Sequence, residues 1–115
     1  MSKAAFWQRG EAIDYVNDTN EKIEANKVLV IGSLIGVAGT DIAPGETGAV
    51  HIEGVFEIPK SETAVLAIGD VVAFTADKIA KCAAGGKPCG VAVAAATDAD
   101  PTALVKINIG AAPTA

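Results

Sequence analysis

The strongest constraint on what this chain can fold into is a regular alternation of apolar and polar residues in short runs. Residues 49–53 and 104–109 alternate most clearly, and this spacing places one face of an extended strand in the core and the other in solvent. Further short runs rich in Val, Ile and Ala lie between Gly, Pro and Asp residues, as in strands joined by tight turns. The sequence therefore predicts an all-β protein, a small single-domain β-barrel or sandwich of short antiparallel strands with an extended N-terminal arm.

The chain of 115 residues has the length of a single domain. Residues 1–11 are expected to form the arm and residues 12–115 the single β domain. One short helix is predicted over residues 61–67, because Ser61 suits an N-cap and Glu62 would lie in the first turn. Strands are predicted over residues 12–16, 23–31, 34–38, 47–55, 71–74, 79–82, 90–95 and 103–109.

A weak repeat of about 54 residues, from Gly36 to Gly90, runs through the chain. Each copy contains a strand, a loop with Asp and Pro, and an alternating strand. Duplication of one unit and chance similarity in a chain rich in Ala, Gly and Val are both open at this point. The first copy reads Gly36-Val37-Ala38, Thr40-Asp41 and Pro44, and the second reads Gly90-Val91-Ala92, Thr97-Asp98 and Pro101.

The charge of the chain argues against nucleic acid and membrane partners. The formal net charge is −5, the sequence pI is about 4.7, and no two Lys or Arg residues are adjacent. Binding to nucleic acid or to an anionic membrane needs clustered cations. The longest apolar run, residues 28–38, is about half as long as the ~20 residues that a membrane helix requires.

No arrangement of residues in the sequence indicates catalysis, a cofactor or a metal. His51 is the only His and lies in an alternating strand, where its side chain is expected to face solvent. Lys87 precedes Pro88, so the phosphate-binding pattern with Ser or Thr after Gly-Lys is absent. Cys82 and Cys89 flank a predicted turn, and three interpretations stay open: two small buried apolar residues, a cross-strand disulfide, or half of a metal site.

The start of the chain holds most of its few aromatic residues. Phe6, Trp7 and Tyr15 are three of the five aromatic side chains. Chain termini are mobile unless they dock, and aromatic residues are typical anchors of protein interfaces. Phe6, Trp7 and Tyr15 are therefore candidate interface residues, and the alternative is that they cover the chain's own core.

Several segments of the middle region resemble one known family. Residues 54–60 read Gly-Val-Phe-Glu-Ile-Pro-Lys, and residues 68–70 read Ile-Gly-Asp. Together with residues 34–38, 41–48 and 89–93, they resemble the tailed-bacteriophage capsid cement (decoration) proteins, some of which were once labelled predicted phage recombinases. The resemblance covers about residues 10–110. The missing phosphate loop and the acidic charge oppose a recombinase.

The resemblance implies a structural protein on the outer surface of a phage head, without catalytic residues. Its expected partner is the major capsid protein, whose subunit contacts it would stabilise, and its expected state is a homotrimer. It would be made in the host bacterial cytoplasm, and Phe6, Trp7 and Tyr15 become candidate contacts with the capsid or a sister subunit. The alternative is a ligand- or carbohydrate-binding β-module displayed on a virion surface, which would need an aromatic platform.

Overall fold

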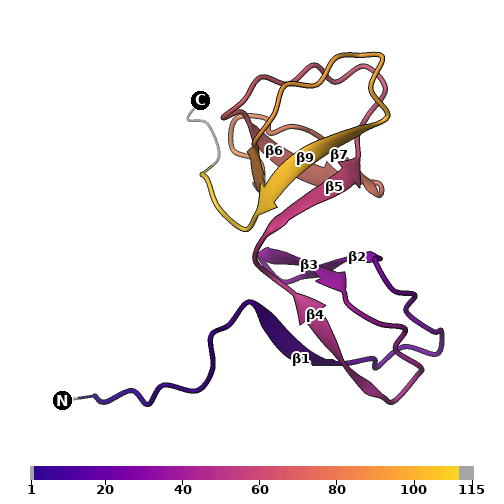
Figure 1. Ribbon diagram of the computed structural model, residues 1–115, viewed down its shortest axis with the longest axis vertical. Helices are drawn as coiled ribbons and strands as arrows, with labels where there is room; N and C mark the ends of the chain where they lie inside the picture. Colours follow the sequence, from indigo (N-terminus) through magenta and orange to yellow (C-terminus); the bar gives the residue numbers. More distant parts are fainter. Residues whose placement is uncertain (1, 112–115) are drawn as a thin grey trace.

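The computed structural model of the protein describes residues 2–111, which form strands but no helix (Figure 1). Met1 and residues 112–115, which belong to the expected arm and β domain, lie outside the described residues. The strands are β1 (Ala12–Val16), β2 (Val28–Ile31), β3 (Leu34–Ala38), β4 (Thr47–His51), β5 (Val55–Pro59), β6 (Val71–Thr75), β7 (Lys78–Lys81), β8 (Gly90–Ala92) and β9 (Thr102–Ile107).

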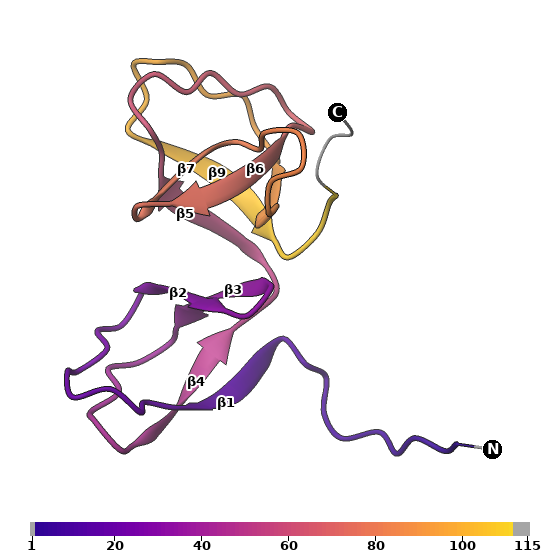
Figure 2. The same cartoon turned by 180° about the vertical axis from the view of Figure 1, so that it is seen from behind.

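The strands form two antiparallel sheets, so the all-β prediction is confirmed. A four-stranded sheet has the order β1-β4-β3-β2, and a five-stranded sheet has the order β5-β9-β8-β6-β7. Figures 1 and 2 show the two sheets in separate halves of the molecule, joined through the link from β4 to β5. In the second sheet the edge strands β5 and β7 do not pair with each other, and an isolated bridge joins Lys60, which follows β5, to Ile79 of β7. The protein is therefore a two-sheet sandwich and not a closed barrel.

Each half has its own apolar cluster, and two side chains connect the clusters. The cluster of the second half includes Ile35 from β3 of the first half, and Val28 from β2 packs against this cluster. The two halves therefore share part of one core. The first cluster contains Ile23, Ala38, Ile42 and Val50, and the second is built mainly from β5, β6, β7, β8 and β9.

The predicted helix over residues 61–67 is wrong. The segment begins with a turn closed by a hydrogen bond from Ala64 N to Ser61 O at 3.0 Å, and Leu66 then forms an antiparallel bridge to Ala96. Leu66 is buried by that bridge, so tertiary pairing overrides a weak local helix signal. The predicted strand over residues 47–55 also divides, because β4 ends at His51 and β5 begins at Val55 after Gly54, whose φ is 132°.

The two halves repeat one design. Strands β1, β4, β3 and β2 of the first sheet have the same order as β5, β9, β8 and β6 of the second, and β7 is an addition to the second half. The backbone hydrogen bonds also correspond. Ile23 and Ile42 exchange two bonds of 2.9 and 2.8 Å, and Leu66 and Ala96 exchange two of 2.9 Å. The repeat of a strand, a loop and an alternating strand that the sequence suggested is therefore present in the fold.

The repeated glycine has a packing reason. A Cβ atom on Gly36 would meet the side chain of Val50, and one on Gly90 would lie 2.7 Å from the side chain of Val105. Val50 and Val105 are fully buried on corresponding strands, β4 and β9. In each half, the strand β3 or β8 can approach its neighbour this closely only because the residue at this position has no side chain.

The loops correspond in a different register from the one that the sequence suggests. The bridges equate Ile42 with Ala96, so Asp41 corresponds to Ala95 and not to Asp98. Glu46 instead corresponds to Asp100: their carboxylates accept hydrogen bonds from Ala43 N at 3.0 Å and Thr97 N at 2.8 Å.

Candidate interaction surface

The N-terminal arm is the most exposed apolar part of the described chain. Phe6 is 87% exposed and Trp7 is 90% exposed, and both views show the arm leaving β1 and running away from the sheets (Figures 1 and 2). The one side-chain hydrogen bond from residues 2–10 joins Gln8 Nε2 to Ala12 O at 3.1 Å. Two large apolar side chains in water favour association with another surface, so the arm offers binding energy to a second molecule.

Tyr15 occupies a different environment from Phe6 and Trp7. It lies on β1, is half-buried, and packs against the apolar cluster of the first half. Tyr15 therefore contacts the chain's own core, whereas Phe6 and Trp7 are free of it. An interface role for all three stays a prediction.

His51 is exposed at the end of β4, as the sequence predicts. Its ring lies beside that of Phe56 on β5, with centroids 6.2 Å apart and planes tilted by 39°. The pair spans the link between the sheets, so its geometry serves packing at the joint between the halves.

Cys82 and Cys89 are buried free thiols on opposite sides of β6. Cys82 N donates to Val71 O and Cys89 N to Val72 O, both at 2.8 Å. Two strand spacings of about 4.8 Å place the flanking backbones about 10 Å apart, beyond the ~7 Å limit for a disulfide. The interpretation as small buried apolar residues is therefore the one that fits. Burial, and secondarily the nearby Cys82, raises the pKa of Cys89 from 9.0 to about 11.

Within residues 2–111, no group of three His, Cys, Asp or Glu side chains could hold a metal ion. The same part of the chain contains no helix able to cross a membrane.

Two buried polar side chains hold the long loops in corresponding ways. Asn17 is fully buried and its Nδ2 donates to Glu21 O at 2.8 Å and Ile42 O at 2.9 Å. Lys60 is also buried, and its Nζ donates to Ser61 O at 3.1 Å and Ala64 O at 2.7 Å. Each residue follows an edge strand, β1 or β5, so each half uses one buried nitrogen to fix its loop.

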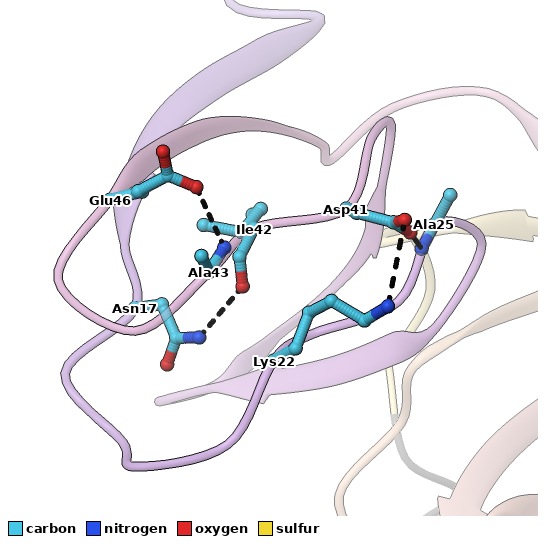
Figure 3. Close-up of polar contacts among 7 residues, drawn as sticks. All are labelled: Asn17, Lys22, Ala25, Asp41, Ile42, Ala43 and Glu46. Atoms are coloured by element: carbon cyan, nitrogen blue, oxygen red, sulfur yellow. Dashed lines mark hydrogen bonds and ion pairs between the residues drawn. The ribbon is translucent and has the colours of Figure 1, made fainter.

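The loops at the far end of the first half form a polar surface, here called the first tip (residues 17–27 and 39–46). Lys22 Nζ lies 3.9 Å from the Asp41 carboxylate, which also accepts a hydrogen bond from Ala25 N at 2.8 Å (Figure 3). Figure 3 also shows Glu46 bonded to Ala43 N and Asn17 bonded to Ile42 O. The first tip therefore combines a buried amide with solvent-facing charges.

The corresponding loops of the second half form the second tip (residues 60–70 and 93–101), which exposes two large aliphatic side chains among polar residues. Val65 is 61% exposed and Ile68 is 73% exposed. Neither residue was predicted to be functional from the sequence, because Val65 lies in the segment expected to be helical and Ile68 begins the Ile-Gly-Asp segment of the family resemblance. The repeat could have indicated them if it had been aligned in its correct register, in which Ile23 of the first half corresponds to Leu66 of the second.

Two repeated small sheets with an aromatic arm at one end define a small all-β protein with apolar groups directed outward. Its sequence belongs to the phage cement protein family, because the family model described as phage cement protein matches residues 7–107. The match begins at Trp7 on the arm and includes all nine strands. The protein is therefore a structural capsid cement protein, whose partner is the phage capsid. No match was found among curated proteins or among solved structures.

Proposed function

We propose that this cement protein sits on the outside of the phage head as a homotrimer and holds neighbouring major capsid subunits together. The arm, residues 1–11, attaches the β domain, residues 12–115, to the capsid or to a sister subunit. The observation that carries this proposal is the exposure of Phe6 and Trp7 on a segment that leaves the sheets. Tyr15, at the base of the arm, would extend the same contact along β1.

The mechanism is multivalent attachment. A trimer presents three arms to the shell at once, so contacts that are individually modest combine into tight binding. Binding that favours the closed shell stabilises it by mass action, without any chemical step. The cement thereby opposes the pressure of the packaged DNA at the joints between capsid subunits.

Free sheet edges support self-association. Strands β1 and β2 each pair on one side only within the described sheet, and such edges accept a further strand from another chain. A head-to-tail contact between copies closes into a ring when its rotation permits. Native mass measurement of the free protein and of protein released from heads tests the trimer, and a monomer in both states contradicts it.

The proposal includes no enzymatic activity and no binding of nucleic acid. A net charge of −5 repels the phosphate backbone, and His51 lies beside an aromatic ring at a strand end. Synthesis takes place in the host bacterial cytoplasm. No contact in the described residues favours the carbohydrate-binding alternative, because the two most exposed aromatic residues lie on the arm and not on a sheet face.

The decisive experiment compares heads with and without this protein. DNA release on heating, or on treatment with a chelator, is followed by dye fluorescence. We expect release at a higher temperature from heads that carry the protein, and addition of purified protein should restore the shift. Equal release temperatures would contradict the cement mechanism even if the protein is found on the shell. A salt-sensitive gel shift with duplex DNA would contradict the exclusion of nucleic acid.

A further inference from the structure

The two halves of this chain provide an internal comparison of surface residues. Because Ile23 corresponds to Leu66 and Ile42 to Ala96 through their bridges, each residue of the first tip has a counterpart on the second. Residues that differ in chemistry at the same backbone position are not required by the shared fold.

Three positions are apolar on the second tip but charged or small on the first tip. Lys22 and Asp41 form an ion pair at 3.9 Å on the first tip. On the second tip, Val65 corresponds to Lys22 and Ala95 corresponds to Asp41. Ala25 corresponds to Ile68. The second tip thus has aliphatic side chains where the first tip has an ion pair and a methyl group. The first tip shows that the fold accepts charged and small residues at these positions, so the fold itself does not require Val65 and Ile68, which are 61% and 73% exposed.

We propose that this apolar patch, formed by Val65, Ile68 and Ala95, is a second capsid contact that packs on an apolar surface of a major capsid subunit. The proposal rests on the cement function proposed above. Two large aliphatic side chains and a methyl group expose at most a few hundred Å², about the size of an ordinary surface patch. A stable complex between two free copies needs about 800 Å² per partner. The patch is therefore too small to hold a dimer alone, but it suits a protein that other contacts already hold on the shell.

The position of the patch supports the capsid as its partner. The second tip lies at the top of Figure 1, and the arm with Phe6 and Trp7 lies at the opposite end of the molecule. Apolar groups at both ends allow one chain to contact two capsid subunits at once. The patch would therefore add a second point of attachment to the one that the arm provides.

The test exchanges the residues of one tip for those of the other. The variant Val65→Lys with Ile68→Ala carries the residues of the first tip, which the shared fold accepts. We expect it to keep the melting temperature and native mass of the wild type. Its half-saturation concentration on heads assembled without this protein should rise roughly ten- to a hundredfold, as expected when two buried aliphatic contacts are lost. The control, Lys22→Ala with Ala25→Ser on the first tip, should bind like the wild type.

Three outcomes would overturn the inference. If the wild type binds heads and the second-tip variant binds equally well, the patch is not a capsid contact, although the cement function stands. If the variant lowers the native mass of the free protein and leaves head binding unchanged, a second copy covers the patch instead. If the wild type does not bind heads at all, the proposed function fails and this inference with it. Ile68→Ala alone is a milder variant, which removes only an exposed side chain and should weaken binding by a smaller factor.

Discussion

The side chain of Asn108 acts as a strand partner for Ile35 in the other half of the protein. Ile35 N donates to Asn108 Oδ1 at 2.9 Å, and Asn108 Nδ2 donates to Ile35 O at 2.8 Å and to Ile52 O at 2.7 Å. Asn108 has a φ of 62°, a left-handed conformation that Asn tolerates better than most residues. One amide thus joins the end of β9 to β3 and to the link between the sheets.

We expect Asn108→Gly to lower the free energy of unfolding by about 2–3 kcal/mol, because three hydrogen bonds are lost while the backbone conformation stays easy. Urea unfolding measures the change. Asn26→Gly is the matched control, since Asn26 also has a positive φ, of 71°, and the corresponding residue of the second half is Gly69. A loss of less than about 0.5 kcal/mol for Asn108→Gly would show that the amide does not hold the halves together.

A second prediction concerns the buried amide of the first half. Asn17→Ala removes two donated hydrogen bonds and leaves Ile42 O without its side-chain partner. We expect a loss of about 2–3 kcal/mol in stability and faster hydrogen exchange in residues 17–27. Asn20→Ala changes an exposed neighbour in the same loop and should alter stability by only a few tenths of a kcal/mol. Similar effects of the two variants would contradict this assignment.

Substitutions in the arm are expected to weaken binding to heads without changing the stability of the fold. Phe6→Ala with Trp7→Ala should leave stability within about 0.5 kcal/mol of the wild type, because both side chains are exposed, but should weaken attachment to heads. Deletion of residues 2–10 should act in the same direction. Sedimentation of protein with heads measures attachment, and unchanged occupancy would remove the arm from the interface.

Tyr15 provides the contrast to the arm variants. Tyr15→Ala should destabilise the fold by about 1–3 kcal/mol, because the ring packs against the first-half cluster. Thermal unfolding of the free protein measures this effect. A stability equal to that of the wild type would show that the ring contributes little to the core.

The raised pKa of Cys89 predicts that the folded protein loses stability at alkaline pH. Its pKa is raised from 9.0 to about 11, mainly by burial and then by the nearby Cys82, so the folded state holds the thiol proton more tightly than the unfolded state. This contribution to stability is fully present below pH 9 and is lost as the pH rises from 9 to about 11. Urea unfolding at several pH values should show a shallower decline for Cys89→Ala than for the wild type over this range. Equal slopes would contradict the shifted pKa.

Local patterns in the sequence located most of the strands. Strands β1 and β3 have the predicted bounds, because alternation and flanking turn residues act within a few residues of the chain. The Gly-Val-Ala repeat also indicated a repeated unit, because at both Gly36 and Gly90 a side chain would clash with a valine of the neighbouring strand. The family resemblance also indicated the structural role, because the family motifs are short segments that can be identified in the sequence itself.

Only the tertiary structure decided how the halves meet and which apolar residues face outward. The bonds between Asn108 and Ile35 join residues that are 73 positions apart, and the loss of chain entropy on closing such a loop is repaid only by the complete set of contacts. Leu66 forms an antiparallel bridge with Ala96 and is not helical, because the backbone of Ala96 supplies its hydrogen-bond partners. That bridge fixes the register that leaves Val65 and Ile68 in solvent. Long-range pairing decides such register, and no short segment of the sequence contains it.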